Sequence, residues 1–534
     1  MFSQVFRRRR PGSRGYWGVA AAVSAGSVLS VLIAWIGGAV AAEKGAVPVT
    51  QNYRRPRIAI IGGGIGGTSS AYFLRKLFGE TAQIDLYNIG DIGGRTATIK
   101  LAGREYEAGG SIIHGRNKYL VDLVDQLGLS KRTKVPTSTG FHNGEEFVLT
   151  ESKWNLVTVG KLVWRYGFDF FRLYQEVDAW MTQFEKIYTL QDEGKAFKTV
   201  EDMVDAMGGE AFINGTRDPL IPLLKSHGYS DRFIGEVVAA ATRVSYGQFE
   251  DISVFAGMVG VAGVQPGLWA VHEGNYKVSE ALLKESKANV YKSLVMSVEL
   301  NSTSEPRETF IIHSVPWQQS YAEAKQKSKD RIEYDIVIVD IPQHGKPPMQ
   351  HPINFAGFDA GSHVPSGPYP GEYRHTVANF IDGVPKASTF GLDNPESLPD
   401  SIIEVVEPKL RFRSLAKNFP VDVTPEEAAA KEGYVYKVFS TEPLDDEQVE
   451  ALFETVKERT FVDWLAYPYY GTTDQIPPFE LNPGVYYVNA IEWAASAIEM
   501  SVIGSKNAAL LAHQYWTGQS SNDEEAKVED KDEL

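Results

Sequence analysis

Three glycines near the start of the chain have the spacing that lets a backbone bind a phosphate group. Gly62, Gly64 and Gly67 directly follow the β-branched run 57–61 and precede a segment of helical composition, 68–78. In such a strand, turn and helix, the first glycine permits a tight turn, the second lets the backbone approach a pyrophosphate, and the third lets helix and strand pack closely. The amides at the helix N-terminus then face the phosphates. The pattern predicts a dinucleotide-binding turn.

A second strand is expected over residues 83–87, at the distance that this kind of site requires. Its end should carry an acidic residue for the adenosine ribose, but the chain has Asn88 there. An amide can still hydrogen-bond a hydroxyl group, although without the charge. We therefore expect Asn88 at the ribose.

A further glycine turn with a cation lies just beyond this strand and favours FAD over NAD. Gly94 and Arg95 belong to this turn, and the guanidinium of Arg95 would face the pyrophosphate charge. The chain has no second G-x-G-x-x-G run, so no bound NADPH is expected. The substrate is then the electron donor, and molecular oxygen is the simplest acceptor.

The composition limits what other groups can do. The 534 residues include no cysteine, which excludes disulfides, thiolate metal sites and cysteine nucleophiles. Lys and Arg number 53 against 68 Asp and Glu, which gives a net charge of −15. Because phosphate-backbone binding needs an excess of cations, nucleic acid is not expected as a partner. The length suits two interleaved domains around a large cofactor.

Later elements should complete the nucleotide domain and build a second one. The runs 334–339 and 485–489 predict buried strands of the nucleotide domain. A helix over 497–516 follows a small-residue turn, and its N-terminus would face a flavin ring or belong to an ordinary buried helix. The aromatic segment 161–188 has helical spacing. We expect most of its side chains in the core and some around a pocket for an apolar substrate.

The two ends of the chain predict a location. A cluster of five arginines precedes 15–42, a stretch without charge whose apolar part, 28–36, is shorter than a membrane span. We expect a cleaved signal peptide over 1–42, with an uncleaved anchor as the alternative. The last four residues, 531–534, read KDEL, an address read by the KDEL receptor. Both ends together predict the lumen of the endoplasmic reticulum, where the sequons at Asn214 and Asn301 are usable glycosylation acceptors.

Eight stretches of the chain carry a resemblance to one family. They read RIAIIGGGIGGTSSAYFLR (57–75), IGGRTAT (92–98), YEAGGSIIH (106–114), KLVWRYGF (161–168), RVSYGQ (243–248), GLWAV (267–271), WLAYP (464–468) and IEWAASAIEMS (491–501). Together they resemble prenylcysteine oxidase, also called prenylcysteine lyase. The first two are common to many flavin amine oxidases, whereas KLVWRYGF, RVSYGQ and WLAYP are far more particular.

The resemblance implies a fold and a reaction. The fold would be α/β, an FAD-binding two-dinucleotide-binding (Rossmann-like) domain interleaved with an α+β substrate domain, as in flavin amine oxidases. The enzyme would cleave the thioether of farnesylcysteine or geranylgeranylcysteine, with noncovalent FAD, to cysteine, a prenyl aldehyde and hydrogen peroxide. Such substrates come from degraded prenylated proteins. Their apolar chains also suggest that the protein associates with a membrane surface.

The residue patterns and the resemblance together predict a division of the chain. Its predicted parts are a signal peptide or anchor over 1–42, a linker over 43–56, nucleotide-domain parts at about 57–130, 285–345 and 480–516, substrate-domain parts at about 131–284 and 346–479, and an acidic tail over 517–534.

By matching position, the resemblance also implies site residues. The expected FAD contacts are Gly62, Gly64, Gly67, Gly94, Arg95, Gly110, Ser111, Val295, Glu492, Glu499 and Met500. His114 would bind the substrate carboxylate or water, or serve as a structural histidine. Arg243 would pair with the cysteine carboxylate or with an internal acid, and Tyr246 is a third candidate for catalysis.

Two positions depart from the family pattern. Asn88 replaces the ribose acid, and the family's EGGN run is His272-Glu273-Gly274-Asn275 here, which loses a glycine. Two other functions therefore stay open: a luminal amine or polyamine oxidase on the same fold, and a noncatalytic luminal binding protein that has lost FAD. Asn88 is the best support for the second.

Overall fold

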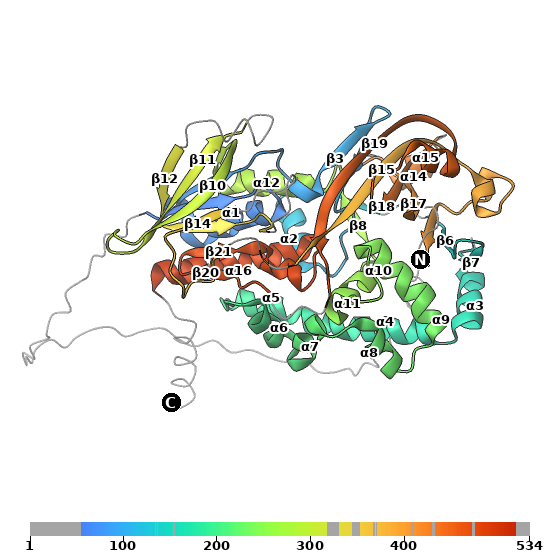
Figure 1. Cartoon of the computed structure of the whole chain (residues 1–534), viewed down its shortest axis with the longest axis horizontal. Coiled ribbons are helices and arrows are strands. Elements are labelled where there is room, and N and C mark those ends of the chain that lie inside the picture. Colours follow the sequence, from blue (N-terminus) through green and yellow to red (C-terminus); the bar gives the residue numbers. More distant parts are fainter. Residues whose placement is uncertain are drawn as a thin grey trace, which may run out of the picture. The chain divides into compact units, whose positions relative to one another are not determined.

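The β-branched run at the first glycine turn forms β1 (Arg57–Ile61), the centre of a six-stranded sheet. The computed structural model describes residues 55–133, 135, 137–152, 155–317, 330–343, 353–366, 369, 371–406, 411–429, 433–471 and 476–518 (Figure 1). The predicted N-terminal targeting segment and the KDEL tail lie outside these ranges. Among the described residues, no helix has the length and apolar character needed to cross a membrane.

The six-stranded sheet has the order β20-β21-β13-β1-β2-β9. Its other strands are β2 (Gln83–Tyr87), β9 (Asn289–Tyr291), β13 (Ile336–Val339), β20 (Glu480–Asn482) and β21 (Val485–Tyr487). β1 pairs in parallel with β2 on one side and with β13 on the other. After β1 the chain forms β2 on one side of it, and later it returns to form β13 on the other side. In such sheets, ligands bind at the carboxyl ends of the two neighbouring strands from which the chain continues in opposite directions. In this sheet those strands are β1 and β13.

Three helices position this crevice. α1 (Ile65–Phe78) follows the glycine turn and packs against both α16 (Ile498–Thr517) and α12 (Tyr276–Ser286). The predicted strands and the C-terminal helix are confirmed to within a few residues. α1, at the blue end of the sequence colours, and α16, at the red end, lie beside each other in Figure 1.

A four-stranded sheet continues the nucleotide-binding part of the chain. Its order is β12-β11-β10-β14, with β10 (Ser293–Asn301), β11 (Thr309–Pro316), β12 (Asp330–Tyr334) and β14 (Asn354–Ala356). β14 lies after residue 345 and α12 begins nine residues before residue 285, so both elements extend the nucleotide-binding parts beyond the predicted boundaries.

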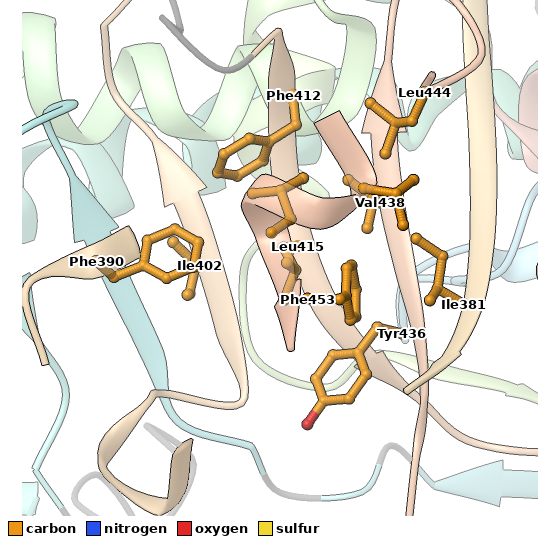
Figure 2. Packing of buried hydrophobic residues seen from close by; sticks show 11 residues of the cluster. Ile381, Phe390, Ile402, Phe412, Leu415, Tyr436, Val438, Leu444 and Phe453 are labelled. Carbon is orange, nitrogen blue, oxygen red and sulfur yellow. The ribbon is translucent and has the colours of Figure 1, made fainter. Parts of the chain in front are cut away.

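A seven-stranded sheet of order β19-β15-β18-β17-β16-β6-β7 forms the base of the other part. Its strands are β6 (Thr139–His142), β7 (Phe147–Thr150), β15 (Tyr373–Pro385), β16 (Ser401–Glu404), β17 (Phe412–Asn418), β18 (Val435–Ser440) and β19 (Phe453–Pro468). α15 (Asp446–Leu452) packs against β19. Figure 2 shows the buried cluster formed by side chains of these strands and of α15, including Phe412, Val438 and Phe453.

A helical region completes this part of the chain. It comprises α3 (Asn155–Tyr166), α4 (Asp169–Phe184), α5 (Lys186–Asp192), α6 (Val200–Gly208), α7 (Glu210–Arg217), α8 (Leu220–Ser226), α9 (Asp231–Phe233), the π-helical η4 (Ile234–Val238), α10 (Ala239–Tyr246) and α11 (Val254–Ala262). η4 runs directly into α10. The helical spacing of 161–188 is confirmed by α3, α4 and α5.

The expectation that most of the aromatic segment is core is wrong for several of its aromatic side chains. Leu173, Val177 and Tyr188 are buried, but Trp164 and Phe168 are largely exposed. Helical spacing identifies a face of a helix, and it does not say whether a second apolar face has anything to pack against.

Candidate active site

The first glycine turn has the geometry that its spacing predicts. Gly62 has φ +118°, a backbone conformation that side chains rarely adopt. A Cβ on Gly67 would lie 2.0 Å from the carbonyl oxygen of Gly62, so α1 can follow the turn only with glycine there. Gly64 is different, because the nearest heavy atom to a Cβ there is 3.7 Å away, on Asp340. The turn is therefore tight between strand and helix and open beside Gly64, where a pyrophosphate would approach.

The second glycine turn touches the first. The amide of Gly93 donates to the carbonyl of Gly63 at 2.9 Å, and a Cβ on Gly94 would lie 3.1 Å from Cα of Gly64. The two turns form one surface of close-packed backbone.

Asn88 ties these two turns together. Its Oδ1 accepts from the amide of Gly63 at 3.2 Å, and its Nδ2 donates to the carbonyl oxygen of Gly90 at 2.7 Å. An acid at this position cannot donate the second bond. A ribose contact for Asn88 stays a prediction, and the structure gives its amide a second role in joining the turns.

A third turn and the C-terminal segment close the site. The amide of Gly110 donates to the carbonyl of Arg95 at 2.9 Å. A Cβ on Gly110 would lie 3.2 Å from the side chain of Ile498, the first residue of α16. The Arg95 guanidinium pairs with the Glu492 carboxylate in η7 (Val488–Trp493). Seven of the predicted cofactor contacts are thereby gathered: Gly62, Gly64, Gly67, Gly94, Arg95, Gly110 and Glu492.

Glu492 is the buried centre of this cluster. Its side chain is 1% exposed, and it accepts from the hydroxyl of Tyr373 at 3.1 Å and from Nδ2 of Asn489 at 2.9 Å, besides Arg95. The Arg95 side chain is 32% exposed. Part of the Arg95 side chain therefore stays exposed, while its guanidinium is fixed by the Glu492 carboxylate and by the carbonyl oxygen of Ala466 at 2.7 Å.

Asp340 enters the glycine turn from the neighbouring strand. It follows β13, and its Oδ2 accepts from the amide of Gly67 at 2.5 Å. Burial, with the nearby charge of Glu492, raises the pKa of Asp340 to about 8. Asp340 is not among the predicted site residues, although its place directly after the buried run 336–339 was a usable signal, since the carboxyl ends of parallel strands meet at one edge of a sheet.

The raised pKa of Asp340 makes stability depend on pH. The folded value of about 8 lies above the ordinary value of 3.8, so folding takes up a proton between them. The stabilisation that protonated Asp340 gives to the folded state is fully present below pH 3.8. It is lost as the pH rises through about 8. Asp340→Asn keeps an acceptor oxygen for Gly67 and removes the titration. We expect the variant to lose stability less steeply than the parent between about pH 5 and pH 8, as measured by chemical denaturation of the apoprotein.

The exposed Asp393 supplies the matched control for this titration. Asp393→Asn should leave the pH slope of the parent unchanged. An unaltered slope in Asp340→Asn would mean that other buried groups carry the pH dependence.

The remaining predicted cofactor contacts lie at the edges of the cluster. Glu499 is buried, and its carboxylate accepts from the amides of Tyr119 and Leu120 at 2.8 and 3.0 Å. It thereby stabilises the N-terminus of α2 (Lys118–Gln126). Met500 is buried in α16 and Val295 in β10.

Ser111 follows Gly110 and is partly exposed. Flavin contacts for Ser111, Val295, Glu499 and Met500 stay predictions.

Tyr246 joins three of the resembling stretches at the C-terminal turn. Its hydroxyl donates to the carbonyl oxygen of Ser496 at 2.8 Å, two residues before α16. Its ring meets those of Tyr467 and Tyr470 edge-on, with centroids 5.1 and 4.9 Å away. Burial raises the pKa of Tyr246 well above its ordinary value. The phenol therefore stays protonated, and its proton is used to hold the turn.

Arg243 lies one helical turn before Tyr246 on α10. Its Nη2 donates to the exposed Glu250 at 2.9 Å, while its buried Nη1 has no hydrogen-bonding partner among the described residues. The guanidinium therefore pairs with an acid of the same chain, and a contact between Arg243 and a substrate carboxylate stays a prediction.

His114 follows the third turn. Its Nδ1 accepts from the amide of Arg116 at 3.1 Å, so in the neutral ring the proton lies on Nε2. Burial, with the charge of Arg116, lowers the pKa of His114. The buried Nε2 has no partner within the described part of the chain. His114 is thus a neutral ring with an unused N–H donor.

A buried acid and a buried lysine were not found from the sequence. Nζ of Lys437 donates to the carbonyl of Glu107 at 3.1 Å, directly before the third turn. Burial raises the pKa of the Glu107 carboxyl to about 7 and lowers the pKa of Lys437 to about 8. No simple spacing marks this pair, because β4 (Arg104–Glu107) and β18 are far apart in sequence.

The altered EGGN run retains its turn. Asn275 donates to the carbonyl of Gly110 at 2.9 Å, and its amide N–H donates to Glu107 at 2.9 Å. Glu273, in the place of the missing glycine, has φ +67°. The chain therefore adopts the turn with a side chain at a left-handed position, at a cost of about 1 kcal/mol.

A cavity of about 420 Å³ lies beside this region, next to the segment that follows His114. It is lined by Gly115, Arg116, Lys118, Val121, Asp122, Glu185, Tyr188, Thr189 and Asp192. Five of these nine residues are charged, whereas pockets for apolar ligands carry only a few polar groups.

The two sequons differ in setting. Asn214 is exposed, but it lies within α7 and the following Thr216 is buried. Asn301 ends β10, and the next two residues are exposed. Acceptors are typical of surface loops, so Asn301 fits better, and glycosylation of both stays a prediction.

The sequence comparisons decide the family. A family model described as prenylcysteine lyase matches residues 149–525. A prenylcysteine oxidase 1-like protein of Homo sapiens is 36% identical over 467 residues, which cover 86% of this chain and 90% of that protein. Prenylcysteine oxidase 1 of Mus musculus is 36% identical over 499 residues, covering 92% and 94%. The chain belongs to the prenylcysteine lyase family. The resemblance carried by the motifs is confirmed.

The nucleotide-binding part of this prenylcysteine lyase family member matches a second model. An NAD(P)-binding Rossmann-like domain model covers residues 60–127, which include both glycine turns. Among solved structures, a fatty acid isomerase from P. acnes has a TM-score of 0.55 at 14% identity, covering 85% of this chain and 97% of that chain. A putrescine oxidase variant has a TM-score of 0.51 at 13% identity, covering 85% and 98%. These likenesses confirm the predicted fold class.

Proposed function

We propose that the chain binds FAD noncovalently and uses it to cleave prenylcysteine thioethers oxidatively. The observation that carries the proposal is the hydrogen bond from Tyr246 to Ser496, with the rings of Tyr467 and Tyr470 packed around it. It brings the two particular stretches RVSYGQ and WLAYP to the turn before α16. The same turn is tied through Glu492 and Arg95 to the glycine turns.

The residues present fit a flavin dinucleotide. The open side of Gly64 and the N-terminus of α1 would take the pyrophosphate, with the partly exposed Arg95 as the nearby cation. Gly110 and the small residues Ala494 and Ala495 before α16 would hold the flavin part of the group. When bound, FAD supplies a two-electron acceptor for the substrate.

The chain's own residues would bind and orient the substrate. The Nε2–H of His114 and the Nη1 of Arg243, both without a partner among the described residues, would be two donors for the carboxylate of the cysteine part. Tyr246 is a positioning group, because its only proton is engaged by Ser496. The overall change balances as thioether, water and oxygen giving cysteine, prenyl aldehyde and hydrogen peroxide. Two electrons leave the allylic carbon, and oxygen receives them.

We further propose that the chain acts in the lumen of the endoplasmic reticulum. The uncharged segment 15–42 and the terminal KDEL tetrapeptide support this location, and the KDEL receptor would be its partner there.

Anaerobic mixing tests the proposed reaction. Farnesylcysteine should bleach the flavin absorbance of the purified protein, and air should restore it with peroxide and aldehyde in equal amounts. S-methylcysteine should react far more slowly. It lacks the allylic group that delocalises the developing cation, and it lacks the apolar chain that contributes about 0.8 kcal/mol per buried CH₂.

Two outcomes would replace the proposal. Faster bleaching by spermine than by farnesylcysteine would make the chain an amine oxidase. A protein that stays colourless after incubation with FAD would be a binding protein of the same fold.

A further inference from the structure

The first glycine turn contains a glycine that its phosphate-binding spacing does not require. Gly66 lies between the second and third glycines of the motif, where the motif sets no residue type. Its φ is outside the positive range that favours glycine. A Cβ on Gly66 would lie 2.2 Å from Oδ1 of Asp340 and 2.8 Å from its Oδ2. The absent side chain therefore makes room for a carboxyl group within the turn.

The carboxyl of Asp340 lies on the phosphate side of this turn. Its Oδ2 accepts from the amide of Gly67 at 2.5 Å, in the first turn of α1. The same oxygen is the nearest heavy atom to a Cβ on Gly64, at 3.7 Å, on the open side where the dinucleotide would approach. Among the described residues, Gly67 is the only hydrogen-bonding partner of this carboxyl. Because Asp340 is also partly exposed, a ligand at the turn would meet its second oxygen.

Two charged side chains from neighbouring elements face this carboxyl. Arg95 comes from the second glycine turn and Glu492 from η7, and these two pair with each other. The basic residues of α1, Arg75 and Lys76, lie in its last turn, at the far end of the helix. An ionised Asp340 would therefore leave the phosphate side with a net negative charge. Such a charge repels a pyrophosphate, whereas a neutral Asp340 leaves a balanced ion pair.

The surroundings of Asp340 favour its neutral form. Burial, with the nearby charge of Glu492, raises its pKa to about 8, although the hydrogen bond at Oδ2 and the nearby guanidinium favour the carboxylate. Burial also raises the pKa of Tyr373 on β15 and of Tyr487 on β21 well above the ordinary value of tyrosine. Asp340 therefore changes its charge in a range of pH in which these two phenols keep theirs.

We propose that Asp340 is a cofactor-binding residue that acts as a neutral carboxylic acid, so that FAD binding requires its protonation. In this form Oδ2 still accepts from Gly67, and the proton on Oδ1 is available to an oxygen of the dinucleotide. A carboxylate has no proton to donate and adds repulsion. This role rests on the proposed function, because it needs FAD at the glycine turns. It adds that the cofactor and a proton bind together.

The affinity for FAD should therefore fall as the pH rises. Only the protonated fraction of the protein would bind, and the apparent affinity scales with the binding-competent fraction. FAD should bind about tenfold more weakly at about pH 9 than at about pH 6, because the pKa of Asp340 is about 8. Titration of the apoprotein with FAD, followed by flavin fluorescence, measures the affinity, and circular dichroism checks the fold at both pH values. A pH indicator in weak buffer should report uptake of about one proton per bound FAD at about pH 9, and none at about pH 6.

Asp340→Asn is the decisive variant, because an amide copies the neutral acid. Its oxygen can accept from Gly67, its nitrogen can donate to the dinucleotide, and it does not titrate. Its FAD affinity should be equal at the two pH values, and at about pH 9 it should exceed that of the parent about tenfold. A gain of affinity cannot come from misfolding. Asp393→Asn, at an exposed position, is the matched control and should keep the pH dependence of the parent.

The outcomes separate this role from other titrations and from the proposed function. Lys437 donates to the backbone directly before the third turn, and burial lowers its pKa to about 8. An Asp340→Asn protein that loses FAD affinity as steeply as the parent would assign the dependence to such a group and overturn the proposal. A parent that binds FAD equally at both pH values without proton uptake would also overturn it, and would leave the proposed function intact. A parent that binds no FAD at either pH would contradict the proposed function itself, and this role of Asp340 with it.

Discussion

Gly67→Ala is expected to weaken FAD binding by about 10- to 100-fold. The added Cβ would lie 2.0 Å from the carbonyl oxygen of Gly62. Both partners in this clash are backbone, so no side chain can turn away, and α1 must shift from β1. Overpacking of this kind costs about 1–3 kcal/mol, and each 1.4 kcal/mol is tenfold in affinity. Titration of the apoprotein with FAD, followed by flavin fluorescence, measures the change.

Gly90→Ala is the matched control for this substitution. Gly90 lies just after Asn88, and a Cβ there meets nothing within 4 Å. Its φ is outside the positive range that disfavours side chains. FAD affinity should be that of the parent. A Gly67→Ala protein that binds FAD normally would show that the dinucleotide does not use this turn.

The nucleotide-binding half of the fold was predictable because its signals are local. A β-branched run, a glycine turn and a helix within 57–78 determine their own structure, and β1 and α1 confirm them. The strand at 334–339 was found in the same way, because a parallel strand buried on both faces is a continuous apolar run. The strands beside β13 could not be predicted in this way, because β1 and β21 lie far from it in the sequence.

The partners within the site could not be predicted, because each joins distant parts of the chain. Asp340 accepts from Gly67, and the carboxylate of Glu499 holds the N-terminus of α2, which begins at Lys118. A sequence position near a cofactor motif does not say which neighbour takes the carboxylate. Glu499 was expected to contact the flavin, but its carboxylate oxygens already accept hydrogen bonds from the backbone amides at the start of α2.

The exposure of Trp164 shows the same limit on the surface. Hydrophobicity predicts that a side chain leaves water, and it does not say whether the chain's own core or an external partner removes it. The stretch KLVWRYGF indicated the family correctly, but its apolar residues were also expected to lie mostly in the core. In the structure, Leu162 and Tyr166 of that stretch are buried, and Trp164 is not.

Glu492→Gln is expected to lower the free energy of unfolding by about 3 kcal/mol. The substitution keeps the shape of the side chain but removes the charge that faces Arg95, Tyr373 and Asn489. Removing one partner of a buried pair costs about 3–5 kcal/mol, because the other charge stays without compensation. The value should fall at the low end, since the Arg95 side chain is 32% exposed and water screens part of its charge. Chemical denaturation of the apoprotein measures the loss.

Asp446→Asn is the matched control, because it removes an exposed ion pair in place of a buried one. Arg459 and Asp446 also pair, but their side chains are 41% and 84% exposed. Exposed pairs are worth less than about 1 kcal/mol, so this variant should be close to the parent. Added FAD gives a second readout. If Arg95 faces the pyrophosphate, the bound anion replaces part of the missing charge, and the stability lost by Glu492→Gln should shrink. A deficit that is the same with and without FAD would place the pyrophosphate away from Arg95.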